Sequence, residues 1–415
     1  MNAFTYLFLL TLLLSSITHL WLMARQQRSV GRQRPQTPEQ FRDKITLNSH
    51  QKAADYTVAG LTLARIELLF STLLLLAWTL GGGLAWLNQY WHGLELSPLH
   101  NGAAVIISLM LISHLLELPV TIWRTFIIEQ RFGFNHTRVG LFINDNLREL
   151  LMTLIIIGPL IYVILWLIYN QDNWWLTVWL VWTGFSLLML WAYPTFIAPL
   201  FNRFTELDDP TLKQRIEQLL QRSGFSSNGI FVMDGSRRSG HGNAYFTGLG
   251  NSKRIVFYDT LLKSLNHAEI EAVLAHELGH FHHGHVRKRL ISMMTLSLGA
   301  LILISWLSGQ PWFYHGLGVD VTEPYMALIL FMLCAPVFGF FLHPLTMAIT
   351  RRHEYQADAF AALHSDAQQL CNALIKLYDE NATTLTPDPL YSAFHDSHPS
   401  ALARINHLAD NNTST

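Results

Sequence analysis

Residues 273–308 read VLAHELGHFHHGHVRKRLISMMTLSLGALILISWLS. The stretch begins with a histidine-rich helical pattern and continues, after a basic segment, into apolar residues numerous enough to cross a bilayer. In its first part, His276, Glu277 and His280 form an H-E-x-x-H motif. Two histidines four residues apart project from one face of a helix and can bind one metal ion together. The sequence therefore joins a candidate metal-binding helix directly to a candidate membrane span.

The composition of the whole chain is that of a membrane protein. Of its 415 residues, 50% are apolar and only 14% are charged, whereas soluble proteins average about 25% charged residues. The formal net charge is -1, so a basic surface for nucleic acid is not expected. Disorder is excluded because so much apolar surface can be buried. Cys334 and Cys371 indicate neither a disulfide framework nor a thiolate metal site.

Seven apolar stretches are long enough to span a bilayer, since a spanning helix needs about 20 residues. They lie at 3–24, 58–87, 103–126, 149–169, 174–200, 290–308 and 325–349. The third contains His114 and Glu117, and ionisable groups at this depth either line a cavity or reach the surface near a helix end. Both interpretations stay open.

The distribution of basic residues predicts the orientation. Arg25, Arg28, Arg32 and Arg34 follow the first span, while the segments 88–102, 170–173 and 309–324 contain no lysine or arginine. The positive-inside rule therefore places the N-terminus outside. Because no positive residue precedes the first span, we expect a retained helix instead of a cleaved signal peptide.

Two hydrophilic segments, both expected in the cytoplasm, are large enough to carry chemistry. The first predicts a helix at 209–222, extended segments at 229–233 and 244–258, and helices from residue 267. We therefore expect an all-α multi-pass membrane protein with a small α+β hydrophilic portion. The predicted division is 1–201 (spans one to five), 202–289 (hydrophilic portion with the H-E-x-x-H helix), 290–349 (spans six and seven) and 350–415 (C-terminal portion).

A catalytic zinc ion is bound by three protein ligands and keeps one position open. His276 and His280 supply two ligands, and Glu277 is placed to deprotonate a zinc-bound water as general base. The metzincin pattern would need a glycine at position 283 and a histidine at 286, where His283 and Val286 stand. The third ligand must therefore come from elsewhere in the chain.

Downstream, Glu354 and Asp358 lie one helical turn apart. Glu354 is a candidate third ligand, and Asp358 a candidate hydrogen-bond acceptor for a ligating histidine; a solvated charged helix face is the alternative. His398, before Pro399, and Arg404 are cationic donors that can stabilise an oxyanion. A histidine without a catalytic role is the other interpretation. Four further histidines are interpreted as a polar or interfacial cluster and not as extra ligands: His282, His283, His285 and His353.

Several short motifs, taken in order, are similar to those of one known family. They are FGFN (132–135), PTFIAPLFN (194–202), VMDGSRRS (232–239), NAYF (243–246), HELGH (276–280), EYQAD (354–358) and His398-Pro399 followed by Arg404. Together with the seven spans, they make the chain resemble the type 1 CAAX prenyl proteases, the sterile-24-like integral-membrane zinc endopeptidases. The resemblance covers most of the chain.

The resemblance implies a ring of seven helices around an intramembrane chamber, with a gluzincin-like site that binds one Zn2+ per chain. It implies that Glu354 is the third zinc ligand, and that His398 and Arg404 assist the transition state. Asn243, Ala244, Tyr245 and Phe246 match the edge strand on which a peptide or protein substrate, possibly prenylated, would lie.

Two features depart from the resemblance. The loop between spans six and seven has only about sixteen residues, and the chain ends in Asn-Asn-Thr-Ser-Thr without a retrieval signal. We therefore favour a bacterial inner membrane over the endoplasmic reticulum membrane. Three alternatives stay open: an HtpX-like quality-control protease, a seven-span protein with a structural zinc ion, and a membrane plug or chaperone that does not cut.

Overall fold

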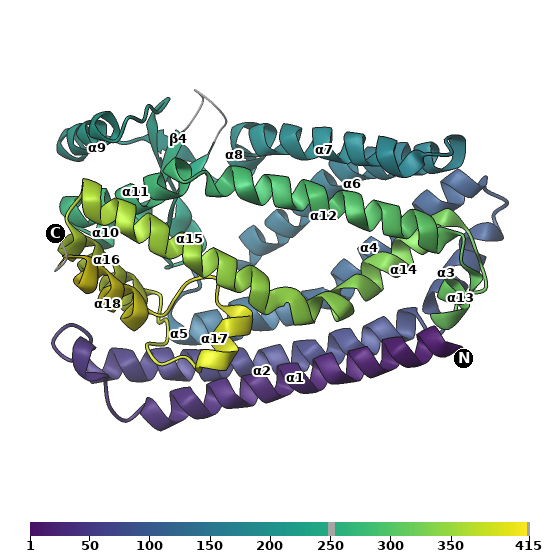
Figure 1. Cartoon of the computed structure of the whole chain (residues 1–415), viewed down its shortest axis with the longest axis horizontal. Coiled ribbons are helices and arrows are strands. Elements are labelled where there is room, and N and C mark those ends of the chain that lie inside the picture. The colour runs from purple at the N-terminus through teal and green to yellow at the C-terminus, as the bar shows by residue number, and fades with distance from the viewer. Residues whose placement is uncertain (248–253, 413–415) are drawn as a thin grey trace.

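The computed structural model describes residues 1–247 and 254–412 and consists mainly of long helices (Figure 1). Seven spans in this part of the chain are long and apolar enough to cross a membrane, and each overlaps a predicted stretch. They are Ala3–Gln33 (α1), Leu47–Trp78 (α2), Pro98–Phe132 (α4, η2 and α5), Val139–Asn170 (α6), Trp174–Phe201 (α7, η3 and α8), His285–Ser308 (α12) and Pro324–His364 (α14, η5 and α15).

The predicted end of the second span was wrong. Helix α2 ends at Trp78, and a separate short helix, α3 (Gly83–His92), follows it. Between the two helices lie consecutive glycines, and Gly82 has a φ of 79°, a left-handed conformation that glycine adopts without steric cost. Hydropathy alone does not reveal such a turn because glycine does not interrupt an apolar average.

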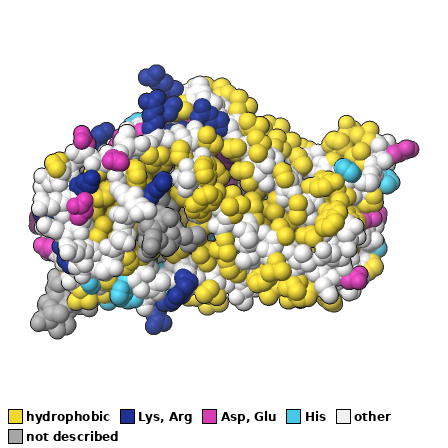
Figure 2. All heavy atoms as spheres, turned by 90° about the horizontal axis from the view of Figure 1, so that it is seen from above, with side chains coloured by type: hydrophobic (Ala, Val, Ile, Leu, Met, Phe, Trp, Pro, Cys, Tyr) yellow, Lys and Arg dark blue, Asp and Glu magenta, His cyan; other side chains and the backbone are white. Residues whose placement is uncertain are grey.

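The surface of the spans is apolar. Large side chains such as Leu69, Leu73, Leu180 and Leu296 are exposed. Figure 2 shows apolar side chains over the middle and right of the face formed by α7 and α12, with Lys and Arg gathered toward the left end. An apolar surface of this extent fits contact with lipid, and it leaves the charged end as the hydrophilic part.

The ionisable residues of the third span differ in their surroundings. His114 lines a cavity between α4 and α6, together with Glu149 and apolar side chains. Glu117 is exposed on α4 and does not belong to the lining of this cavity.

The hydrophilic part contains a four-stranded sheet of order β1-β2-β4-β3. Its strands are Phe204–Glu206 (β1), Ile230–Met233 (β2), Ala244–Thr247 (β3) and Arg254–Tyr258 (β4). Strands β2 and β4 are parallel, and the other two pairs are antiparallel. Strand β1 was not predicted because three residues are too short for a recognisable alternation. Within the described residues β3 pairs only with β4, so its outer edge can accept another strand.

Helices pack around this sheet and enclose the second hydrophobic core of the molecule. Ile216, Ile255, Phe257, Leu278 and Leu370 belong to this core and are almost fully buried. Helix α11 lies inside it and contacts α9, α15, α16 and β3. The helices of the hydrophilic part are Pro210–Arg222 (α9), Asp259–Ser264 (α10), His267–His282 (α11), Ala367–Glu380 (α16), Pro389–His395 (α17) and Ala401–Asn412 (α18).

Candidate active site

Helix α11 carries the H-E-x-x-H motif and begins at a well-formed cap. The Asn266 side chain accepts hydrogen bonds from the backbone N–H groups of Ala268 and Glu269, and the Glu269 carboxylate accepts the N–H of Asn266 at 2.8 Å. This reciprocal arrangement is a capping box. Ile270 and Leu274 are buried in the core, so the apolar face of α11 fixes its rotation and turns the two motif histidines toward α15.

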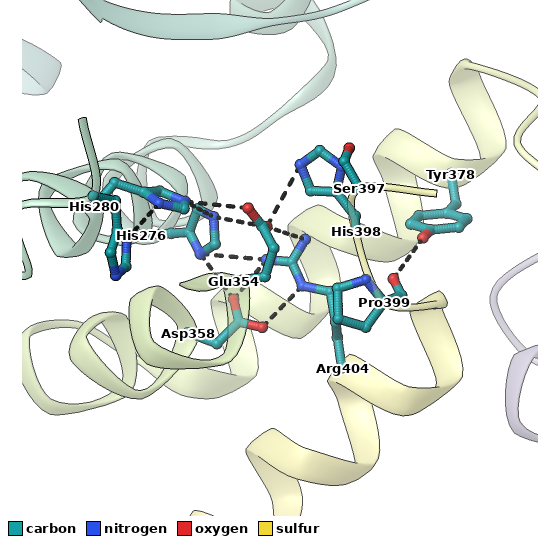
Figure 3. Close-up of polar contacts among 10 residues, drawn as sticks. His276, His280, Glu354, Asp358, Tyr378, Ser397, His398, Pro399 and Arg404 are labelled. Atoms are coloured by element: carbon teal, nitrogen blue, oxygen red, sulfur yellow. Dashed lines mark hydrogen bonds and ion pairs between the residues drawn. The ribbon is translucent and has the colours of Figure 1, made fainter. Parts of the chain in front are cut away.

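Three side chains from two helices converge at one point (Figure 3). The Nε2 atom of His276 lies 3.3 Å from Nε2 of His280 and 3.5 Å from Oε2 of Glu354. The Nε2 atom of His280 lies 3.3 Å from Oε1 of Glu354. One donor atom from each residue lies within 4.8 Å of the other two. Nitrogen and carboxylate donors at this spacing can bind one divalent ion.

The carboxylate of Glu354 provides a test of this fit. Glu354 is 4% exposed, and among the described residues no group donates a hydrogen bond to its Oε2 atom. The nitrogens of His276, His398 and Arg404 lie 3.5–3.7 Å from this oxygen without donating a hydrogen bond to it, and a buried, charged oxygen without a donor is costly. A cation held between this oxygen and the two histidines would remove that cost, so the residues present fit a metal ion.

Asp358 and Arg404 lie behind the first histidine. The fully buried Asp358 places Oδ1 2.8 Å from Nδ1 of His276. Arg404, on α18, donates from Nε and Nη2 to the two Asp358 oxygens at 2.9 and 2.5 Å. Burial lowers the pKa of His276, but the contacts with Asp358 and Glu354 outweigh it and raise this pKa to about 9. Because Oδ1 of Asp358 accepts a hydrogen bond from Nδ1 of His276, the Nε2 atom of this ring faces the other two donors.

Glu277 lies at a small recess beside this cluster. Burial raises the pKa of its carboxyl group, against the effect of His276 and His280. A carboxylate whose pKa lies above the usual range is a better proton acceptor near neutral pH. The other residues of the recess come from the edge strand, the core and the C-terminal segment: Gly242, Asn243, Ala244, Leu261, Val273, His276, Leu370, Leu374, Leu377, His398 and Arg404.

The histidine of the C-terminal segment reaches the same cluster from the open side. The Nε2 atom of His398 lies 3.5 Å from Oε2 of Glu354, and its side chain is 60% exposed. Its Nδ1 atom is 2.9 Å from the Ser397 hydroxyl oxygen. Arg404, by contrast, is 5% exposed. His398 is therefore accessible from solvent, whereas Arg404, which also lines the recess, is almost fully buried and bonded to Asp358.

The predicted substrate-binding residues lie at the start of β3. Asn243 is exposed, and its Oδ1 accepts the N–H of Ala244 at 2.8 Å. Ala244 is buried, and the Phe246 ring packs near Phe281. The Tyr245 ring lies near that of Tyr258, a residue of the neighbouring strand. The recess and β3 are thus adjacent, because the recess is lined by Ala244, the first residue of β3, and by the preceding Asn243.

The loop that leads into β3 is anchored to the membrane helices, a role that the sequence analysis missed. Arg238 donates from Nε to Oδ2 of Asp145 at 2.8 Å, from Nη2 to Oδ1 of Asp145 at 3.0 Å and from Nη1 to Asn202 at 2.9 Å. Its carbonyl accepts the N–H of His136 at 3.0 Å, and Asn135 forms a bridge with Ser239. Two motifs of unassigned role, 132–135 and 194–202, therefore meet at this loop.

The remaining histidines form the expected cluster beside the site. His282 is exposed, His283 and His353 are half-buried, and His285 is buried. The rings of His285 and His353 stack with their centroids 3.9 Å apart. None of the four belongs to the group of three donors described above.

Comparison with known proteins identifies the family. The family sequence model for the N-terminal part of CAAX prenyl proteases, with five membrane helices, matches residues 26–203. The family model for peptidase family M48 matches residues 206–412. CAAX prenyl protease 1 of Saccharomyces cerevisiae is 39% identical over 72% of this chain and 69% of its own length. The chain belongs to the CAAX prenyl protease 1 family. The human homologue of that protease is 29% identical over 96% of this chain and 94% of its own length.

A solved structure of the family supports the same conclusion. The crystal structure of Saccharomyces mikatae Ste24p matches with a TM-score of 0.89 and 30% identity, covering 98% of this chain and 99% of that one. The predicted family, fold class and enzyme class are therefore confirmed: the protein is a multi-pass membrane metalloendopeptidase that acts on peptides. The relatives named here are eukaryotic, so they do not support the predicted bacterial membrane.

Proposed function

We propose that this family member uses one zinc ion, held by His276, His280 and Glu354, to cleave a peptide chain laid along β3. The observation that carries the proposal is the convergence of these three donors beside Glu277, at a recess that is also lined by Ala244, where β3 begins, and by the preceding Asn243. When bound, zinc supplies Lewis-acid activation of water and of a carbonyl group.

The side chains around the zinc ion transfer protons, stabilise the intermediate, orient a ligand and bind the substrate. Glu277 takes a proton from the attacking water and returns it to the leaving amine. His398 is exposed beside Glu354, so it can donate a hydrogen bond to the oxyanion of the tetrahedral intermediate. Asp358 and Arg404 support the site by orienting His276. Asn243 binds the substrate backbone at the beginning of the added strand.

The recess favours an aliphatic side chain beside the scissile bond. Leu261, Val273, Leu370, Leu374 and Leu377 line it next to Glu277. The relatives are named for the CAAX motif, and we extend to this protein the removal of the C-terminal tripeptide from prenylated chains. Unmodified membrane proteins, the substrates of the HtpX-like alternative, are the second candidates.

We also propose that the active site faces the cytoplasm, which the gathering of Lys and Arg at one end of the molecule supports (Figure 2). Whether the membrane is a bacterial inner membrane or that of the endoplasmic reticulum stays a prediction. The enclosed chamber and the division at residues 201, 289 and 349 also stay predictions. Helix α12 continues through residue 289, and helix α15 continues through residue 349.

Hydrolysis of a farnesylated CAAX peptide by detergent-purified full-length protein tests the proposal. The Glu277→Ala variant, loaded with the same amount of zinc, is the control. We expect cleavage by the native protein alone, because the variant keeps all three ligands and loses the proton acceptor. Activity retained in Glu277→Ala protein would exclude the assigned base. If neither protein cuts although both bind zinc, CAAX specificity is wrong and unmodified membrane proteins are tested next.

A further inference from the structure

His285 lies directly behind the proposed metal ligand His280. The Nδ1 atoms of the two rings are 2.9 Å apart, on the side of His280 opposite to the Nε2 atom that faces Glu354. His285 is the first residue of α12 and is 5% exposed. It follows Gly284, whose φ of 64° allows the chain to turn between α11 and α12. The turn thus places a buried imidazole against the outer nitrogen of a ligand.

The positions of the ring hydrogens follow from these contacts. If Nε2 of His280 binds the metal, its ring hydrogen must be on Nδ1. That hydrogen points at Nδ1 of His285, which must accept it and therefore carries its own hydrogen on Nε2. The Nε2 atom of His285 lies 2.9 Å from Oε1 of Gln356, an acceptor. Every contact then has one donor and one acceptor.

Packing holds this pair in place. The His285 ring stacks on His353 with an angle of 13° between the planes. Gln356 belongs to α15, the helix that carries Glu354. The chain of hydrogen bonds from His280 through His285 to Gln356 therefore links α11, α12 and α15 around the metal ligands.

We propose that His285 and Gln356 are positioning residues of the metal site, which accept the Nδ1 hydrogen of His280 and hold its Nε2 atom toward the metal. The inference rests on the ligands proposed above. His276 donates to an anionic carboxylate, whereas His280 donates to a neutral imidazole. The two ligands therefore differ in basicity, since an anionic acceptor increases the electron density of the ring more strongly.

Metal titrations of the full-length protein in detergent test the proposal. His285→Asn keeps an acceptor near the Nδ1 position, whereas His285→Phe keeps a ring that can stack but has no acceptor. We expect zinc affinity to fall about 10–100-fold in His285→Phe, with a changed visible spectrum of the cobalt-loaded protein. His285→Asn should stay within about threefold of the native affinity, because its amide oxygen still accepts the Nδ1 hydrogen of His280.

A second pair of variants covers the case in which His285→Phe does not fold. Gln356→Glu keeps the acceptor for His285, and Gln356→Met removes it at similar size, so only the latter should weaken zinc binding. His282→Phe is the matched control, because that ring packs against His283 and Phe360.

Two results would overturn the inference: native zinc affinity and cobalt spectrum in both His285→Phe and Gln356→Met, or equal losses in the variants that keep and lack the acceptor. The proposed ligands are tested separately by His276→Ala. If that variant still binds zinc at native affinity, the ligand assignment itself fails, and the inference fails with it.

Discussion

A Cβ atom on Gly279 would lie 2.8 Å from the Cα atom of Ala357, so α11 and α15 touch backbone to backbone at this position. Gly279 precedes the proposed ligand His280, and Ala357 precedes Asp358. The glycine of the H-E-x-x-H helix therefore sets the distance between the two helices that carry the three proposed ligands. Its role is steric, because a helix interior does not otherwise favour glycine.

Replacing Gly279 by alanine should push the helices apart. We expect the free energy of unfolding to fall by about 1–3 kcal/mol, the usual cost of overpacking, and zinc affinity to fall with it. Thermal unfolding and zinc titration measure the two effects. Gly299→Ala in α12 is the control, since a Cβ atom there meets nothing within 4 Å. Native zinc affinity in Gly279→Ala would show that the helix spacing does not control the site.

Asp358→Asn should weaken zinc binding about 10–100-fold, because His276 loses its anionic acceptor. The change also leaves the Arg404 guanidinium buried without its carboxylate, which costs about 3–5 kcal/mol when a buried pair is broken. Asp388→Asn breaks the ion pair with Arg25, at 3.0 Å, which is more exposed than the Arg404–Asp358 pair and so should cost less stability. If both variants lose stability but only Asp358→Asn loses zinc affinity, the loss of affinity comes from the contact between Asp358 and His276. Equal zinc affinities in the two variants would contradict this role of Asp358.

Arg238→Lys should raise KM more than it lowers kcat. Lysine cannot reproduce the two-pronged contact with Asp145, and a charge-assisted hydrogen bond contributes about 1.5–3 kcal/mol, so we expect KM to rise about tenfold. Zinc content should not change, because the loop positions β3 and not the ligands. Steady-state kinetics and metal analysis separate the two. A fall in kcat alone would indicate that the loop acts on the chemical step.

The stability of the protein should depend on the protonation of His241. Its Nε2 atom lies 3.5 Å from Glu129, and this contact raises its pKa above the ordinary 6.5, although burial and Lys52 oppose it. A raised pKa stabilises the folded state fully below pH 6.5, and this contribution is lost as the pH rises through the higher folded value. Native protein should therefore lose more thermal stability than His241→Gln between pH 6.5 and 9. Parallel profiles for the two proteins would contradict this.

Much of the fold could be predicted from local patterns. Each span is a long apolar run, and the spacing between His276 and His280 indicates a shared helix face without further information. Glu354 was a candidate from spacing alone, and the resemblance to the family favoured it as the third ligand. These features depend on residues close together in the sequence, which is why a single chain reveals them.

The remaining features depend on contacts between distant residues. Gln356 and His285 are 71 positions apart, and Arg238 and Asp145 are 93 apart. The sequence around a single glutamine or arginine does not indicate which distant residue its side chain contacts. The steric role of Gly279 likewise cannot be predicted from the sequence, because it depends on the contact with Ala357 of α15.

The proposed ligand Glu354 belongs to a span that runs from Pro324 to His364, interrupted by the short 3-10 helix η5 (Phe340–Leu342). Because each helical residue advances about 1.5 Å, the length of this helix sets the distance between its lipid-embedded end and the proposed site. For a substrate anchored in the same membrane, we therefore expect cleavage at bonds whose distance from the anchor matches this length.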